Sequence, residues 1–186
     1  MNTTTNPKVS VRQASGEDAA GIAHLGRTTF SETFGHLFRD HERDLANYLA
    51  TTFSVAKIRG SLGEADNFYW LAFLGDRPIG YAKLKYPSAS ELVPSRTAAQ
   101  LQKIYLLMHF LGQGIGVPLL QAALARAAAL GAPTVWLAVL RQNEPAIQFY
   151  RKFGFDRVGP HQFVIGAQTF DFDILSRKTH GNGETT

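Results

Sequence analysis

Three glycines on alternate positions follow an apolar run, and a loop of this composition can bind an anion. The stretch LGQGIG covers Leu111 to Gly116 and comes directly after LQKIYLLMHF. A dinucleotide-binding fingerprint that starts at Gly112 needs a third glycine at position 117, where the chain has Val117. A P-loop needs Lys and then Ser or Thr after its last glycine, and neither follows here. The sequence therefore disfavours a dinucleotide and a nucleoside triphosphate.

Pro118 indicates where the helix after this loop begins. Proline has no amide hydrogen, and its ring clashes with the carbonyl four residues earlier, so it fits only the first turn of a helix. We therefore expect a helix to start near Gly114. The first amides of a helix lack intrahelical acceptors, and with those of Gly112 and Gln113 they can converge on a pyrophosphate at the positive end of the helix dipole. A tight strand-to-helix turn that binds nothing is the alternative.

A second stretch, VLRQNEPAIQFYRKFGF, places a tyrosine where it can do proton chemistry. Asn143 is a favourable N-cap for a short helix, and Gly154 ends that helix. Ala146, Tyr150 and Phe153 then share one face, which points Tyr150 toward a sheet. Its hydroxyl is either a proton donor in a site or part of a core aromatic that hydrogen-bonds to the backbone.

The remaining chain supplies a continuous α/β pattern around these two stretches. Hydrophobic periodicity predicts strands at Val9–Ala14, 68–74, 78–86, 101–110, 134–140 and in a terminal hairpin over 155–166 and 168–178. It predicts helices over 16–38, at about 40–62, after the glycine loop and at 143–154. Residues 87–100 are expected to form a mobile loop. We expect one domain over 8–178, with flexible residues 1–7 and a disordered tail at 179–186.

Composition narrows the classes of function. The chain has 186 residues, a net charge of +4 and no cysteine. Its basic residues are scattered, which argues against nucleic-acid binding, and without a thiol neither a disulfide framework nor a thiolate mechanism is available. His36 and His41 lie on different helix faces, so no catalytic metal is expected. No apolar run is long enough to span a membrane and the first residues lack a signal-peptide core, so a cytoplasmic location is expected.

This combination of segments resembles the GCN5-related N-acetyltransferases, the GNAT superfamily. The resemblance rests on KIYLLM, LGQGIG, the following helix, VWLAVL and the spacing of Asn143, Ala146, Tyr150 and Gly154. The resemblance covers about residues 8–178. It implies a mixed, strongly twisted sheet of about seven strands flanked by helices and splayed between KIYLLM and TVWLAV to form an acetyl-CoA cleft. Members generally transfer the acetyl group directly from acetyl-CoA to an amine, and dimers are common, so a homodimer is an expected partner.

The resemblance also implies roles for individual residues. Backbone groups of three strand residues would align the pantetheine arm, and amides of the glycine loop would hold the pyrophosphate. Tyr150 would protonate the departing CoA thiolate, which makes it the expected catalytic residue. The implied cofactor-binding residues are Ile104, Tyr105, Leu106, Gly112, Gln113, Gly114, Ile115, Gly116, Val117, Asn143 and Tyr150.

A narrower resemblance concerns the acceptor. TTFSETFGHLF, KIYLLMHF and GPHQFVIG, together with Asp173, are similar to the PaiA-type acetyltransferases, which acetylate spermidine and spermine. A polyamine is therefore one expected acceptor. An amino-acid, peptide or drug amine is an alternative, and so is a non-catalytic acyl-CoA-binding regulator. The expected acceptor-binding residues are Glu32, Phe34, His161 and Asp173.

Three features depart from the family pattern. Leu111 occupies the first position of the Q/R-x-x-G-x-G/A signature, so one side-chain contact to the phosphates is missing. Gln100, Gln102 and Ala138 stand where relatives usually carry carboxylates. An amine with a pKa near 10 must lose a proton before it attacks, so the base remains open. The candidates are a water chain, Glu32, Glu144, Asp173 and His161.

Overall fold

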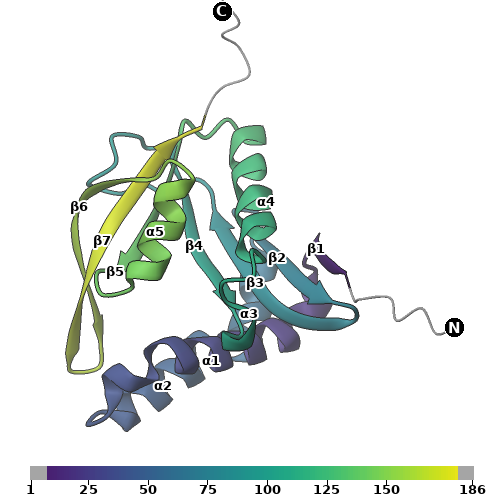
Figure 1. The fold of residues 1–186 in the computed structure, drawn as a ribbon, viewed down its shortest axis with the longest axis vertical. Helices are drawn as coiled ribbons and strands as arrows, with labels where there is room; N and C mark the ends of the chain where they lie inside the picture. Colours follow the sequence, from purple (N-terminus) through teal and green to yellow (C-terminus); the bar gives the residue numbers. More distant parts are fainter. Residues whose placement is uncertain (1–7, 180–186) are drawn as a thin grey trace, which may run out of the picture.

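A computed structural model of the chain describes residues 8–179 (Figure 1). The expected flexible residues 1–7 and all of the expected tail except Thr179 lie outside the described residues. Seven strands form one mixed sheet in the order β1-β2-β3-β4-β5-β7-β6. The strands are β1 (Val9–Gln13), β2 (Asn67–Leu74), β3 (Arg77–Lys85), β4 (Ala99–Leu106), β5 (Thr134–Leu140), β6 (Asp156–Ile165) and β7 (Gln168–Lys178). The expected sheet of about seven strands is confirmed.

The sheet splits between β4 and β5, the parallel pair at its centre. These strands pair only at Ala99 with Val135 and at Gln100 with Trp136, and beyond that point they diverge (Figure 1). The expected splay is therefore confirmed. Because β5 leaves, the β4 edge that faces it has no strand partner after Gln100.

A β-bulge reinforces this break. Lys83 of β3 pairs with Lys103, but its neighbour Leu84 pairs with Leu101, so Gln102 is the extra residue on β4. A bulge bends its strand and shifts the alternation of side chains by one residue. After it, Lys103 and Tyr105 share one face of the sheet, while Ile104 and its neighbour Leu106 share the other.

Five α-helices cover the two faces of the sheet. They are α1 (Ala19–Phe34), α2 (Glu42–Thr52), α3 (Val55–Gly63), α4 (Gly116–Ala129) and α5 (Glu144–Lys152). Helices α4 and α5 bury Leu119, Leu120 and Ile147 in the largest core cluster. On the other face, α1 and α3 bury residues such as Ile22 and Ile58 in a separate cluster. Among residues 8–179, no helix has both the length and the apolar character needed to cross a membrane.

The β6–β7 hairpin reaches away from the sheet toward α2 (Figure 1). A third core cluster joins it to the helices, with Phe30, Phe38, Phe53 and Ile165 all buried. At the hairpin tip, the backbone amide of Ala167 donates a hydrogen bond of 3.1 Å to the Asp44 carboxylate. The hairpin and the α1–α2 region therefore pack as one wall.

Several element boundaries differ from the sequence expectation. The strand expected over 101–110 ends at Leu106, because its partner β3 pairs only as far as Gly80 and the amide of Leu107 turns to donate to the carbonyl of Ile79 at 2.9 Å. The short 3-10 helix η3 (Met108–Phe110) follows. At its other end the strand starts at Ala99, two residues inside the expected loop.

The helical region expected at about 40–62 is two helices. Phe53 lies between them, and Ser54 caps α3 by accepting a hydrogen bond of 3.2 Å from the amide of Lys57. The first helix is likewise shorter than expected, because the 3-10 helices η1 (Gly16–Asp18) and η2 (Gly35–Phe38) flank α1. The hydrophobic periodicity continues through these breaks, which explains why it did not reveal them.

Helix α4 begins at Gly116 rather than near Gly114. Gly112 and Gly114 have φ angles of +74° and +78°, a left-handed conformation that a right-handed helix cannot include. Pro118 still lies in the first turn of α4, as its chemistry requires.

Candidate active site

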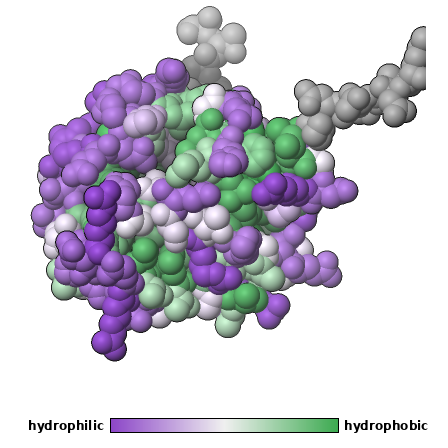
Figure 2. Space-filling view, turned by 60° about the horizontal axis from the view of Figure 1, so that its bottom comes forward, coloured by the Kyte–Doolittle hydropathy of each residue, from purple (hydrophilic) through white to green (hydrophobic). Residues whose placement is uncertain are grey.

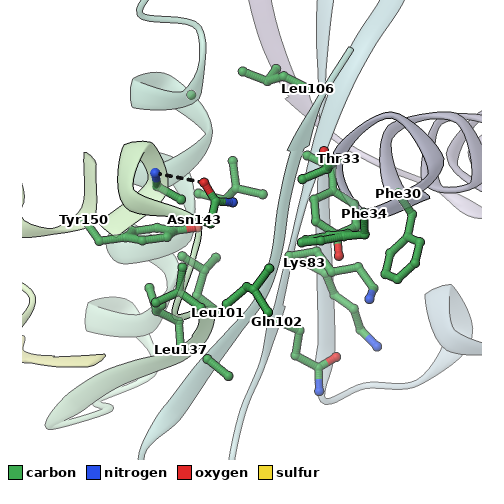
Figure 3. Close-up of a pocket in the computed structure, with 18 of the residues that line it drawn as sticks. Phe30, Thr33, Phe34, Lys83, Leu101, Gln102, Leu106, Leu137, Asn143 and Tyr150 are labelled. Atoms are coloured by element: carbon green, nitrogen blue, oxygen red, sulfur yellow. Dashed lines mark hydrogen bonds between the residues drawn. The ribbon is translucent and has the colours of Figure 1, made fainter. Parts of the chain in front are cut away.

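A cavity of 1210 Å³ lies where β4 and β5 diverge. We call one part of it the loop half, lined by residues 111–117 without Gln113, by Asn143 and by α5. The other part is the aromatic half, lined by α1, η2, α2, α3 and the β6–β7 hairpin. Figure 3 shows Asn143 and Tyr150 on one side of β4, and Phe30, Thr33 and Phe34 on the other. The split in the sheet joins the two halves.

The loop half presents a row of free backbone amides. Within residues 8–179, the amides of residues 112–116 have no backbone acceptor, and the left-handed Gly112 and Gly114 set their orientation. They lie at the N-terminus of α4, the positive end of its dipole. Five of the six loop residues expected to bind the cofactor, all except Gln113, line the cavity.

Two loop residues depart from expectation. The amide of Val117 donates to the carbonyl of Gly114 at 3.1 Å, so it is not free to bind an anion. Gln113 does not line the cavity, and its side chain donates a hydrogen bond of 2.7 Å to the carbonyl of His109. The side chain of Leu111 is 54% exposed at the cavity mouth, where it offers no charge.

The free edge of β4 borders the same half. Ile104, Tyr105 and Leu106 all line the cavity, and β5 does not pair with them. Their outward backbone groups are therefore available to an extended ligand that adds to the sheet as a strand does.

Asn143 and Tyr150 occupy the opposite wall, on α5. The Asn143 side chain accepts a hydrogen bond of 3.3 Å from the amide of Ala146 (Figure 3), which confirms it as the N-cap that fixes the start of the helix. The Tyr150 ring packs against Phe149 and Phe155, with centroids 5.2 and 5.7 Å away. Its position therefore follows from the cap and from this packing.

The Tyr150 hydroxyl is protonated and lies at the cavity. Among residues 8–179 it forms no hydrogen bond, so the alternative of a core tyrosine bonded to the backbone is not what the structure has. Burial raises the pKa of Tyr150 well above its usual value, because the phenolate is costly to desolvate. The group therefore keeps its proton at neutral pH until a stronger base appears.

The aromatic half is a chamber walled by rings that pack at tilted angles. The Phe30 ring lies 4.8 Å from that of Phe34 and 4.7 Å from that of Tyr48, and Phe38 lies 5.2 Å from Phe170. The predicted acceptor residue Phe34 belongs to this wall. Figure 2 shows the outside of this region, the side that carries α1 and α2, where hydrophobic patches lie between hydrophilic side chains. Phe30 and Phe38 thus belong both to the core and to the cavity wall.

His161 also lines the aromatic half, from β6. It is the one of the four proposed proton acceptors that does so. Glu144 does not line the cavity, and its carboxylate accepts a hydrogen bond of 2.5 Å from Gln148. Gln100, Gln102 and the alanine at 138 do line it, so these usual carboxylate positions are neutral in the site itself.

Glu32 is not in the cavity lining, contrary to expectation. Its carboxylate accepts a hydrogen bond of 2.9 Å from the backbone amide of Met108, 76 positions away. It therefore connects α1 to η3, the turn that leads into the glycine loop.

Asp173 is also absent from the lining, and its charge is neutralised. Arg157 and Arg141 donate to its carboxylate at 2.9 and 3.4 Å. The hydrogen bond from Arg157 is the main reason that the pKa of Asp173 is lowered. The expected negative charge for a polyamine does not come from this residue.

The charged side chains that line the cavity are positive, apart from the ring of His161. Among residues 8–179 the lining includes no Asp or Glu, whereas it includes four lysines, namely Lys57, Lys83, Lys103 and Lys152. Lys83 and Lys103 could not be recognised as cavity residues from the sequence. They lie two positions from Tyr81 and Tyr105 on β3 and β4 and therefore share the face of these tyrosines. The same part of the chain holds no cluster of three His, Asp or Glu side chains that could bind a metal ion.

Comparisons with known proteins agree with this architecture. The acetyltransferase (GNAT) family model matches residues 26–155. An uncharacterised N-acetyltransferase of Lactobacillus delbrueckii subsp. lactis is 28% identical over 159 residues, which cover 85% of this chain and 90% of that protein. An uncharacterised N-acetyltransferase of Mycobacterium tuberculosis is 32% identical over 134 residues, covering 72% of this chain and 81% of its own.

A solved structure has the same fold. The PaiA N-acetyltransferase from Thermoplasma acidophilum, crystallised in complex with coenzyme A, has a TM-score of 0.71 at 22% identity and covers 92% of this chain and 99% of its own. The family match spans more than half of the sequence and includes the glycine loop, Asn143 and Tyr150. The chain therefore belongs to the acetyltransferase (GNAT) family.

Proposed function

We propose that this enzyme transfers the acetyl group of acetyl-CoA, the donor of its family, directly to the amine of a small molecule. One observation carries the proposal: a cavity through the split sheet has free amides and the Tyr150 hydroxyl on one side and an aromatic chamber on the other. Two reactants can thus approach the same point from opposite faces of the sheet.

The residues of the loop half suit the donor. The free amides of residues 112–116 would hold its pyrophosphate, and the unpaired edge of β4 at Ile104–Leu106 would hold the amide groups of its pantetheine arm. Leu111 adds nothing to phosphate binding, so backbone groups carry that contact. When bound, acetyl-CoA supplies an activated thioester.

Tyr150 and His161 then handle the protons. As the amine nitrogen bonds to the acetyl carbon and the carbon–sulfur bond breaks, Tyr150 donates its hydroxyl proton to the departing sulfur. His161 takes the proton that the amine loses, directly or through water. Tyr150 recovers a proton from solvent after the products leave.

The polyamine expected from the sequence is the acceptor that the cavity supports less well. A polycation is recognised by local negative charge, and the lining of the described chain offers lysines instead. The alternative of a non-catalytic acyl-CoA-binding regulator is disfavoured by a protonated Tyr150 hydroxyl that faces the cavity without a structural partner. The cytoplasmic location and the homodimer stay predictions.

The test is thiol release from acetyl-CoA with a panel of amines that includes spermidine. We expect turnover with at least one amine, and a fall in kcat of about a hundredfold or more in Tyr150→Phe, the usual size of a lost general acid. Tyr86→Phe is the control, because this tyrosine does not line the cavity. If acetyl-CoA binds but no amine releases thiol above background, the regulator is the better description.

A further inference from the structure

Three lysines, Lys57, Lys83 and Lys103, line the aromatic half, and among residues 8–179 no carboxylate does. We infer that the acceptor carries a carboxylate in addition to its amine, and that Lys83 and Lys103 bind this carboxylate. The inference deepens the proposed acetyl transfer and rests on it for the identity of the bound molecule as the acceptor. It concerns residues other than those that bind the donor.

The two lysines are direct neighbours. Lys83 and Lys103 are register partners in the antiparallel β3–β4 pair, and both line the cavity. Directly opposite residues of such a pair have Cβ atoms about 5 Å apart on the same face, and like charges there are unfavourable. A carboxylate that accepts hydrogen bonds from both ammonium groups turns this repulsion into attraction.

No acidic side chain of the described chain already does this. Within residues 8–179, neither lysine forms an ion pair. The acids whose charge reaches Lys83 are Glu64, which accepts a hydrogen bond from Asn67, and Asp66, which pairs with Lys85 at 3.2 Å. The charge acting on Lys103 is that of Lys83, which only adds repulsion.

Burial of the two neighbouring ammonium groups costs free energy, because it removes water that would hydrate their charges. It is the main cause that lowers the pKa of Lys83 and of Lys103 to about 8 each. At neutral pH both groups are still mostly protonated, so the site presents two poorly hydrated cations. Such groups bind an anion more strongly than exposed lysines do.

Aromatic rings hold the two side chains in place. The Lys103 ammonium lies 5.2 Å from the centroid of Phe53 and 5.5 Å from that of Tyr105, and the Lys83 ammonium lies 5.3 Å from that of Tyr69. These cation–π contacts orient the lysines without neutralising them. The apolar wall beyond them suits the hydrocarbon body of a ligand, so the acceptor class is an amino acid or a similar amphipathic amino carboxylate.

The position of the pair excludes the donor's phosphates as its ligand. Figure 3 shows Lys83 on the Phe34 side of β4, across the strand from Tyr150. The free amides of residues 112–116 belong to the loop half of the cavity. A carboxylate on the lysine pair therefore leaves the amine of the same molecule to point toward the split, where the acetyl group arrives.

The experiment compares acceptors that share their amine and side chain but differ in whether they carry the carboxylate. Amino acids with aromatic and aliphatic side chains are each assayed beside their C-terminal amides, with kcat/KM taken from thiol release. We expect the wild-type enzyme to favour the acids by about tenfold or more, the usual worth of a hydrogen bond to a charged group. Lys83→Met and Lys103→Met should each reduce this ratio, and the double variant should bring it near one. Lys85→Met is the control that should leave it unchanged, since Lys85 pairs with Asp66 outside the cavity.

Two results would overturn the inference. One is a wild-type enzyme that prefers the amides or spermidine. The other is a pair of lysine variants that lose activity toward acids and amides equally, which would indicate a role in proton transfer or folding. The affinity for CoA, measured by calorimetry, should be the same in all variants and serves as the check that they are folded.

A binding measurement separates this inference from the proposed function. 3-Phenylpropanoate, which has no amine, and its amide are titrated into the CoA-bound protein. Binding of the acid that is lost in Lys83→Met and Lys103→Met supports the lysine site even if no amine is ever acetylated. Turnover of uncharged amines without any binding of the acid rejects the lysine site and leaves the acetyltransferase intact.

Discussion

Replacing Gly114 with alanine separates the glycine loop's role in binding from its role in folding. Gly114 has φ +78°, and a Cβ there would meet no atom within 4 Å, so the cost of alanine is that of the left-handed backbone alone. That cost is about 1–2 kcal/mol. Without ligand, the loop of the variant can adopt another backbone conformation and so avoid this strain. The strain then appears only when CoA binding requires the left-handed conformation at position 114. We therefore expect the Kd for CoA to rise by about 5–30-fold while the thermal midpoint hardly moves.

Gly131 is the matched control. It has φ +72° and equally open space for a Cβ, but it lies at the end of α4. Its amide donates to Ala128 at 2.9 Å, and the next amide, of the buried Ala132, donates to Ala127 at 3.0 Å. This turn cannot relax, so Gly131→Ala should lower the thermal midpoint by about 2–8 °C and leave CoA binding unchanged.

Calorimetric titration of CoA and thermal unfolding of both variants give the answer. The expected pattern is a loss of affinity at one glycine and a loss of stability at the other. An unchanged Kd in Gly114→Ala, or an equal loss of affinity in Gly131→Ala, would refute the assignment of the loop amides to the pyrophosphate.

Three further predictions concern other parts of the molecule. Leu111→Arg should leave the Kd for CoA unchanged or lower it, because the 54% exposed side chain can bring a charge to the phosphates without disturbing the core; abolished binding would mean that the phosphates lie elsewhere. Asp44→Ala removes the carboxylate that accepts the hydrogen bond of the Ala167 amide, and so frees the tip of the β6–β7 hairpin beside the aromatic half. The KM for the amine substrate should therefore rise more than kcat falls. A change confined to kcat would contradict this. Arg12→Gln should destabilise the protein at neutral pH, because Arg12 lowers the pKa of Asp18 from 3.8 to about 2. The stabilisation is present above the pKa of Asp18 in the unfolded chain and is lost as the pH falls toward about 2. A difference in denaturation midpoint that does not change with pH would show that the ion pair is not its cause.

The features that the sequence predicted are those whose chemistry is local. The N-cap of Asn143 involves a partner three positions away, and the face shared by Ala146 and Tyr150 follows from one turn of helix. The glycine loop could be recognised because Gly112 and Gly114 tolerate φ angles that other residues avoid. The start of α4 was placed two residues early because the pattern of glycines does not state which of them are left-handed.

The resemblance to PaiA-type enzymes assigned Glu32 and Asp173 to the acceptor, and the sequence did not reveal their actual partners because these are distant along the chain. Glu32 is held by Met108, 76 positions away, and Asp173 by arginines 16 and 32 positions away. An isolated acidic residue in a sequence does not show whether its charge is free. Only the packing of α1 on η3, and of β7 on β5 and β6, decided that these two charges are already used.

The sequence by itself indicated the family, most of the order of strands and helices along the chain, and the positions of the glycine loop and of Tyr150, because each depends on neighbours within a few residues. The tertiary structure alone decided the charge of the aromatic half of the cavity. Lys83 and Lys103 come together only through the register of β3 on β4, and the bulge at Gln102 sets where along β4 that register shifts. Pairing between strands is fixed by the whole sheet rather than by either strand. The resemblance to PaiA-type enzymes therefore implied a polyamine acceptor without revealing the lysine pair on which we base the inference of an amino carboxylate.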